Sequence, residues 1–130
     1  MTYQNKHDKK GVCSKDGVVA EQLFHDLLKK LGDNPKEANK AENRRGIDFH
    51  SVLLDKVDVK AMKRTRRLDA KAQDDLIWVE FLNIGGGRGW LYKKSKYIAF
   101  ERQKDFLLVE RCDLATLCET LCDKIGRAHV

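Results

Sequence analysis

The sequence predicts an α/β domain in which helical segments at the two ends of the chain enclose a group of β-strands. Residues 47–50 and 57–61 alternate apolar and polar side chains with a period of two, which is typical of strands with one buried face. Apolar residues recur at helical spacing over 14–31, and a second helical segment is expected over 113–125. With 130 residues the chain is long enough for one domain, so we expect a polar arm over 1–12 and a single domain over 13–130.

The first helix is expected over 14–31, because Ser14 or Asp16 can cap its start and Gly32 follows its last turn. Its apolar stripe is predicted to consist of Ala20, Leu23, Phe24, Leu27 and Leu31. Glu21 would lie at the edge of this stripe.

The segments between the helices read as strands and loops. A weak strand is expected over 36–41, followed by a hairpin of 47–50 and 57–61 that turns near residues 54–55. The charged residues 63–75 would form a loop or short helix, and the apolar run 76–84 a buried central strand. A glycine-rich loop at 85–89 leads to a second hairpin of 96–101 and 105–111, and Asp113 would cap the closing helix.

Composition narrows the class of protein. The chain carries 26 basic and 20 acidic residues, a net charge of +6 that permits a polyanionic partner. It has no apolar run of the ~20 residues that a membrane-spanning helix needs, and no signal-like stretch over residues 1–10. We therefore expect a cytoplasmic, intracellular protein with no membrane partner, located in the host cell if it is viral. Its four cysteines lack a CxxC-like pair and are expected to be packing thiols, not zinc ligands.

The chemistry is concentrated on the first hairpin. Asp58 and Lys60 are two residues apart on one strand, so they project from the same face. With a turn at Leu54, Asp58 would lie opposite His50, and Asp48 would be a diagonal neighbour at roughly 7–8 Å. Two carboxylates at this separation can bind one Mg²⁺ ion, and Lys60 could orient water or neutralise a phosphate. The alternative is an ordinary exposed hairpin face.

A helix glutamate, a strand aspartate and a strand Asp-x-Lys follow one another along the chain as Glu21, Asp48 and Asp58-Val59-Lys60. In this order the sequence resembles the PD-(D/E)XK nuclease superfamily over roughly residues 14–111, and it is most similar to small junction-resolvase-like and phage-encoded members. Residues 89–92 and 96–100 are similar to the region after the central strand in such proteins. The resemblance implies a restriction-endonuclease-like fold, a mixed central β-sheet flanked by helices with an αβββαβ core.

The resemblance also implies an activity, which is metal-dependent hydrolysis of phosphodiester bonds in DNA with Mg²⁺ or Mn²⁺. It makes Asp48 and Asp58 metal ligands, the Val59 carbonyl a further ligand, Lys60 the residue that orients water, and Glu21 a helix-borne acid at the site. The sequence departs from the family pattern at two positions. Ile47 stands where the family name implies proline, and Asp58 where glutamate is commoner.

Glu80 interrupts the apolar run 76–84. A buried carboxylate without a partner is costly, so it needs either an ion pair or a function. We expect it either to face the metal site as a further catalytic acid or to form a salt bridge at a strand edge. His25 and His50 are expected to have structural roles.

Basic residues bracket the proposed site on both sides in the sequence. Such clusters around paired acids suit a phosphate backbone, although a charge run is usually only a solvated face. The predicted nucleic-acid-binding residues are Arg44, Arg45, Lys63, Arg64, Arg66, Arg67, Arg88, Lys93 and Lys94. Trp90 and Tyr92 could stack on unpaired bases or belong to the core.

Three functions remain open from the sequence. The first is a Mg²⁺-dependent deoxyribonuclease that acts on branched or junction DNA, for which the family implies a homodimer. The second is a non-catalytic nucleic-acid-binding domain with the nuclease fold. The third is a protein-interaction module whose basic face is incidental.

Overall fold

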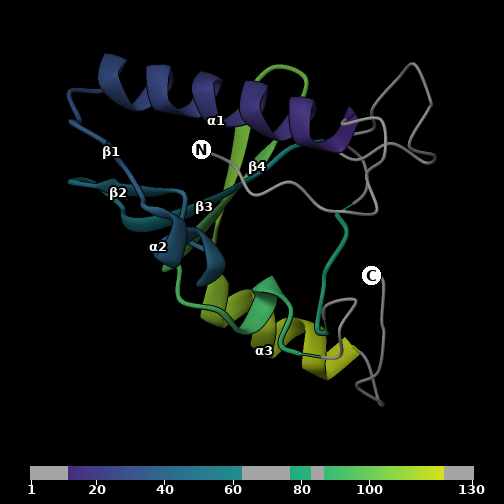
Figure 1. Ribbon diagram of the computed structural model, residues 1–130. Coiled ribbons are helices and arrows are strands. Elements are labelled where there is room, and N and C mark those ends of the chain that lie inside the picture. The colour runs from purple at the N-terminus through teal and green to yellow at the C-terminus, as the bar shows by residue number, and fades with distance from the viewer. Residues whose placement is uncertain (1–11, 63–76, 83–86, 122–130) are drawn as a thin grey trace.

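The structure, a computed structural model, describes residues 12–62, 77–82 and 87–121 (Figure 1). These residues form a five-stranded sheet in the order β1-β2-β3-β4-β5. The strands are β1 (Lys36–Glu37), β2 (Phe49–Ser51), β3 (Asp55–Lys60), β4 (Tyr97–Glu101) and β5 (Phe106–Glu110). Neighbouring strands are antiparallel except for β3 and β4, which are parallel. The prediction of an α/β domain with a mixed central sheet and flanking helices is therefore confirmed.

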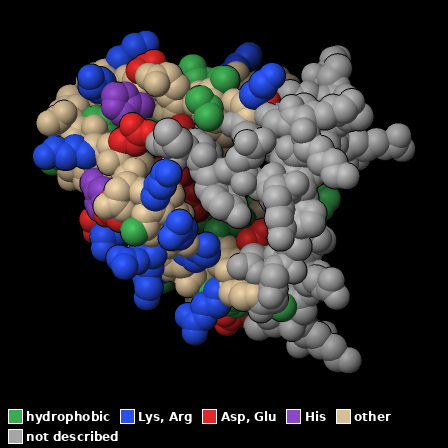
Figure 2. All heavy atoms as spheres, viewed as in Figure 1, with side chains coloured by type: hydrophobic (Ala, Val, Ile, Leu, Met, Phe, Trp, Pro, Cys, Tyr) green, Lys and Arg blue, Asp and Glu red, His purple; other side chains and the backbone are tan. Residues whose placement is uncertain are grey.

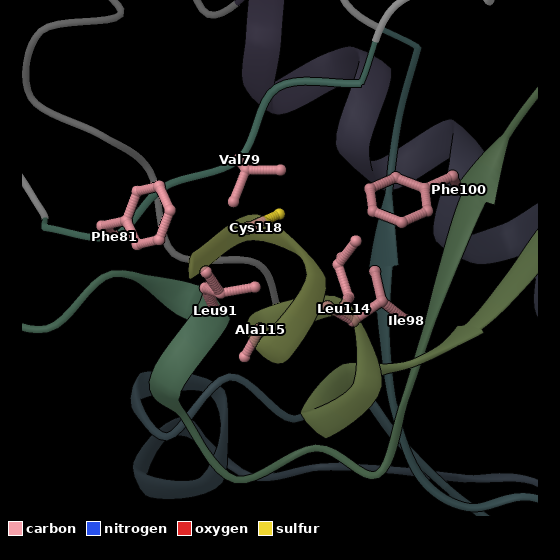
Figure 3. Close-up of a cluster of buried hydrophobic side chains, with 8 residues drawn as sticks. All are labelled: Val79, Phe81, Leu91, Ile98, Phe100, Leu114, Ala115 and Cys118. Carbon is pink, nitrogen blue, oxygen red and sulfur yellow. The ribbon is translucent and has the colours of Figure 1, made fainter. Parts of the chain in front are cut away.

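Helices cover the two faces of this sheet. In Figure 1, α1 (Val12–Lys30) lies across one side and α3 (Arg111–Leu121) lies on the other. Strand β4 alternates between two hydrophobic clusters, because Ala99 points to α1 while Ile98 and Phe100 point to α3. Figure 3 shows the cluster on the α3 side, in which eight buried side chains meet. The middle of the sheet is therefore buried on both faces over residues 57–59 of β3 and 98–100 of β4.

The buried stripe of α1 is narrower than predicted. Ala20, Phe24 and Leu28 are buried at spacings of four residues and pack on β2, β3 and β4. Leu23, Leu27 and Leu31, which were predicted for the stripe, are 37–64% exposed. The helix rests on the strands along one line of contact, so only one row of its apolar residues is covered.

Helix α1 ends as predicted at a glycine. Gly32 adopts a positive φ of 89°, and the N–H of Asp33 donates to the Leu28 carbonyl at 3.0 Å. This left-handed residue closes the helix at low cost only because it has no Cβ. The start differs from the prediction, because α1 begins at Val12, before Ser14 and Asp16.

The first hairpin forms, but its predicted register is wrong. Ser51 pairs with Asp55, so the turn is tighter than the predicted one and His50 lies opposite Lys56. Asp55 has a φ of 64°, a conformation that aspartate tolerates in turns. Because side chains alternate along a strand, Asp58 stays on the predicted face of the sheet. When the observed register is continued along the strands, Asp58 lies opposite Asp48 and not opposite His50.

The predicted strand over 36–41 is reduced to β1, and a short helix follows that the sequence analysis did not expect. Helix α2 (Lys40–Arg44) begins with a capping box. The Asn39 side chain accepts from the N–H of Glu42, and the Glu42 carboxylate accepts from the N–H of Asn39. The spacing Asn-x-x-Glu is a recognised start signal for a helix and predicts α2 in hindsight.

The prediction of a buried central strand over 76–84 is wrong for the described residues 77–82. They make only an isolated bridge between Leu82 and Arg88. The apolar pattern correctly indicates burial, because Val79 and Phe81 belong to the α3-side cluster (Figure 3). Apolar side chains can be buried against a helix as well as in a strand of a sheet. The apolar run in the sequence therefore could not distinguish a buried strand from an irregular segment packed on a helix.

The second hairpin is confirmed by β4 and β5, which pair antiparallel from Tyr97–Glu110 to Glu101–Phe106. Helix α3 begins at Arg111, two residues before the predicted cap Asp113. The segment 63–75, residues 85–86 of the glycine-rich loop and the arm up to residue 11 lie outside the described residues. Within the described part of the chain, no helix has the length and apolar character needed to cross a bilayer.

Candidate active site

Strand β3 carries the central pair of the site at its carboxyl end. Asp58 and Lys60 are the parallel partners of Ile98 and Phe100 in β4, so all four side chains share the α3 face of the sheet. Val57 and Val59 alternate to the α1 face, where they are buried. This alternation anchors the strand and fixes the direction of the two charged side chains. Asp58 is only 3% exposed.

Asp48 reaches the same end of the sheet from the segment that precedes β2. Its backbone N–H donates to the Val57 carbonyl at 2.8 Å. Its side-chain Oδ2 accepts from the backbone N–H of Val59 at 2.8 Å. Asp48 is therefore tied to β3 twice, beside Asp58, whereas the sequence predicted it as a diagonal neighbour with His50 opposite Asp58.

The two aspartates influence each other strongly. Burial raises the pKa of Asp48 well above its ordinary value, and the charges of Asp58 and Glu21 raise it further, as does a hydrogen bond to Asp58. Lys60 opposes this shift but does not cancel it. A carboxylate in such surroundings needs a proton or a cation nearby.

Lys60 supplies one positive charge to this cluster. Its Nζ lies 3.1 Å from Asp58 Oδ2, although that buried oxygen makes no hydrogen bond of regular geometry. Burial alone would lower the pKa of the Lys60 ammonium, but the charges of Asp58, Asp48 and Glu80 outweigh burial and raise it. In the metal-free protein these charges favour the ammonium form of Lys60, which is a hydrogen-bond donor.

Two further acids meet the cluster from opposite sides of the sheet. Glu21 on α1 is half-buried next to Ala20, and its charge acts on Asp48. Glu80 is half-buried within the described segment 77–82, and its charge acts on Lys60. The charge of Glu80 reaches Lys60, but neither the expectation of a catalytic acid nor that of a salt bridge at a strand edge is decided by this effect.

A divalent cation has a donor set to bind here. Asp48 and Asp58 offer carboxylate oxygens, including the Asp58 oxygen that lacks a hydrogen bond. The N–H of Val59 points to Asp48, and in an extended strand the carbonyl of the same residue points to the same side. Among the described residues no three His, Cys, Asp or Glu side chains are grouped to hold a metal ion. Two carboxylates and one carbonyl are the groups here that could hold a divalent cation, and oxygen ligands of this kind are those that Mg²⁺ prefers.

Two of the predicted basic clusters merge into one in the structure. The Nζ of Lys93 donates to the carbonyl of Arg44 at 2.7 Å, and the N–H of Lys94 donates to the carbonyl of Arg45 at 2.9 Å. We call Arg44, Arg45, Lys93 and Lys94 the basic cluster. Figure 2 shows Lys and Arg side chains gathered over the region of α2. Gly46 permits this contact, because it has a φ of 78° and an added Cβ would lie 2.9 Å from the Cβ of Lys93.

The other predicted phosphate-binding residues are placed differently. Arg88 is exposed and forms the backbone bridge to Leu82. Residues Lys63, Arg64, Arg66 and Arg67 lie outside the described part of the chain.

Both histidines have structural contacts. His50 Nε2 pairs with the Glu42 carboxylate of α2, and this contact lowers the pKa of Glu42, after the larger effect of the Asn39 N–H. The His25 ring packs on Phe49 with centroids 5.5 Å apart. Of the cysteines whose side chains the structure describes, Cys118 is buried in the α3-side cluster and Cys112 is exposed.

One neighbour of the site was not predicted from the sequence. Trp90 belongs to a short 3-10 helix, η1 (Trp90–Tyr92), and its ring lies beneath the Lys60 ammonium. Its position next to glycine suggested a base-stacking or core residue, and no spacing rule links residues 60 and 90. Comparisons of the chain with protein-family models, with curated proteins and with solved structures find no match.

Proposed function

We propose that this protein is a metal-dependent DNA endonuclease that hydrolyses phosphodiester bonds, with Mg²⁺ or Mn²⁺ as its cofactor. The observation that carries this proposal is the convergence of Asp48, Asp58 and Lys60 at one end of β3. Paired acids with an adjacent cation are suited to binding a metal ion and a phosphate together.

Asp48, Asp58 and the carbonyl of Val59 would hold the metal ion. When bound, the ion would polarise a phosphate oxygen and lower the pKa of a coordinated water. It would also relieve the repulsion that raises the pKa of Asp48.

The protein's own groups have distinct tasks in this proposal. The Lys60 ammonium donates hydrogen bonds to the attacking water or to a phosphate oxygen. Glu21 and Glu80 keep the centre electronegative and so favour a divalent cation over an empty site. Water enters from the side of Lys60, whose side chain is 25% exposed.

The basic cluster supports DNA as the substrate. Its four residues come from two segments far apart in the sequence, and two hydrogen bonds hold these segments together at the end of α2. Contacts of this kind bind phosphates independently of sequence and weaken as salt rises. Arg88 and the residues Lys63, Arg64, Arg66 and Arg67 would extend this surface.

The topology supports a restriction-endonuclease-like core. Helix α1 precedes three antiparallel strands, and a crossover then leads to β4, which is parallel to β3. By the same family resemblance, the proposal includes branched or junction DNA as substrate, a homodimer that nicks two strands, and an intracellular location.

The test is cleavage of a plasmid and of a four-way junction with Mg²⁺ or Mn²⁺. Wild type should cleave, and Asp58→Asn and Lys60→Met should each lose at least about 100-fold of the rate, since both remove groups that act on the transition state. Asp55→Asn is the matched control, because it removes the same charge from the other end of β3 and asparagine tolerates its positive φ. It should cleave like wild type.

Absence of cleavage with both metals would refute the proposed function. If wild type then still bound DNA at low salt, the chain would be a non-catalytic nucleic-acid-binding domain. Without such binding, only a protein-interaction role would remain.

A further inference from the structure

The ammonium group of Lys60 has a second neighbour that the proposed function does not use. Its Nζ lies 5.1 Å from the centroid of the Trp90 ring, above the ring face. A cation at this distance is attracted by the negative charge of the indole face, and more strongly where water is excluded. Lys60 therefore sits between a carboxylate, Asp58, and an aromatic ring.

The Trp90 ring is itself held firmly. It meets the ring of Phe100 edge-on, with centroids 6.0 Å apart, and it packs against the α3-side cluster. Phe100 is the parallel partner of Lys60 in the sheet, so one pair of strands fixes both the lysine and the support of the tryptophan.

The backbone before Trp90 is fixed by a close approach. The N–H of Gly89 donates to the carbonyl of Phe81 at 2.7 Å. A Cβ added to Gly89 would lie 2.0 Å from the carbonyl oxygen of Glu80, which no side chain could accept. Glycine at this position thus sets the places of Glu80 and Trp90 relative to each other.

Asp58 has two competing partners in the proposed function. Its Oδ2 is the atom nearest to Lys60, at 3.1 Å, and its carboxylate is also a proposed metal ligand. A carboxylate that binds a divalent cation attracts an ammonium group less, because the ion's charge opposes it. The face of Trp90 does not compete with Asp58 for a metal ion, so its attraction for the Lys60 ammonium persists when the ion is bound.

We propose that Trp90 is a positioning residue, which holds the Lys60 ammonium above its ring so that the N–H groups face the reacting phosphate when Asp58 is engaged by the metal ion. The effect on cleavage rests on the proposed function, whereas the contact between the two residues does not. A base-stacking role for Trp90 is the competing possibility.

The contact is tested by NMR in the metal-free protein, with lysines labelled at Cε and the Lys60 signal assigned from Lys60→Met. Protons above an aromatic face resonate upfield, so the Lys60 signal should lie upfield of the other lysines. Trp90→Leu should move it to the position of the exposed lysines, and Trp90→Phe should keep part of the shift. A wild-type signal at the exposed-lysine position would overturn the proposal.

The positioning role is tested by cleavage kinetics. Trp90→Leu should lower kcat by about 10- to 100-fold and leave KM within about twofold, because a displaced catalytic group affects the transition state more than binding. Trp90→Phe should recover most of kcat. Tyr97→Leu is the matched control, because Lys96 Nζ lies 5.6 Å from the Tyr97 ring at the other end of the same strands. It should keep the wild-type kcat.

Other outcomes have definite meanings. A wild-type kcat in Trp90→Leu, or an increase in KM alone as base stacking would give, overturns the positioning role. If Trp90→Leu does not fold, Trp90→Met takes its place as the non-aromatic variant. If wild type cleaves no DNA, the proposed function fails, while the NMR signal still decides whether Trp90 holds Lys60.

Discussion

One aspartate lies against each end of the β2–β3 hairpin, and the protein surrounds these two acids in opposite ways. At the turn end, Asp33 is 7% exposed and faces only donors. It accepts from the Ser51 hydroxyl and from the N–H groups of Val52, Leu53 and Asn34. At the other end, Asp48 accepts from one backbone N–H and faces two further acids.

The electrostatic result differs accordingly. Burial would raise the pKa of Asp33, but its hydrogen bonds outweigh burial and lower it. The pKa of Asp48 is raised by burial and by the charges of Asp58 and Glu21. A satisfied acid stabilises the fold, whereas an acid grouped with others costs stability and is typical of a functional site. The hairpin therefore separates a structural aspartate from a proposed catalytic one.

The largest expected effect separates the two aspartates by activity. Asp48→Asn should lower the rate of metal-dependent DNA cleavage by about 1000-fold, because it removes a proposed metal ligand and its charge. Asp33→Asn should keep kcat within about threefold when assayed well below its unfolding temperature. Equal losses in both variants would contradict the division of roles.

The next effect is on the free energy of unfolding, measured with urea in the absence of divalent cations. Asp33→Asn should lose about 2 kcal/mol, because the amide NH₂ replaces an acceptor that faces buried donors. Asp48→Asn should be as stable as wild type or more stable, because it removes repulsion from Asp58. A larger loss at Asp48 than at Asp33 would reverse the comparison.

The smallest effect is the pH dependence of stability. Because the pKa of Asp33 is lowered on folding, its contribution is complete above the ordinary value of 3.8 and is lost as pH falls through the folded pKa. Because the pKa of Asp48 is raised, the metal-free protein loses stability as pH rises from 3.8 towards that raised pKa. In urea unfolding from pH 3 to pH 8, the deficit of Asp33→Asn should shrink in acid. The stability advantage of Asp48→Asn over wild type should grow with pH. A difference in stability between these two proteins that stays constant with pH would contradict the raised pKa of Asp48.

The sequence predicted local elements where a pattern has one structural solution. The hairpin predicted over 96–101 and 105–111 corresponds to β4 and β5, and Asp48 and Asp58 were expected as diagonal neighbours. The predicted register was wrong because the length of the turn was predicted wrongly. The Asp33 side chain that organises the turn comes from outside the hairpin, so no pattern within the hairpin indicates it.

Other features depend on contacts between distant segments. An apolar run such as 77–82 predicts burial, but its backbone partners belong to the tertiary structure, here Gly89 and Leu91. The basic cluster depends on the contact of Lys93 with Arg44, which no local pattern encodes. The position of Trp90 beneath Lys60 requires the crossover between β3 and β4.

That crossover has a consequence for the order of assembly. Val57 pairs in parallel with Tyr97, so this pairing must close a long loop, which is entropically expensive and slow compared with the two local hairpins. The same segment carries Glu80, Trp90, Lys93 and Lys94. A chain with both hairpins formed but the loop still open would hold Asp48 beside Asp58, yet it would lack the tryptophan face and half of the basic cluster. Completion of the sheet and completion of the site are therefore one and the same folding event.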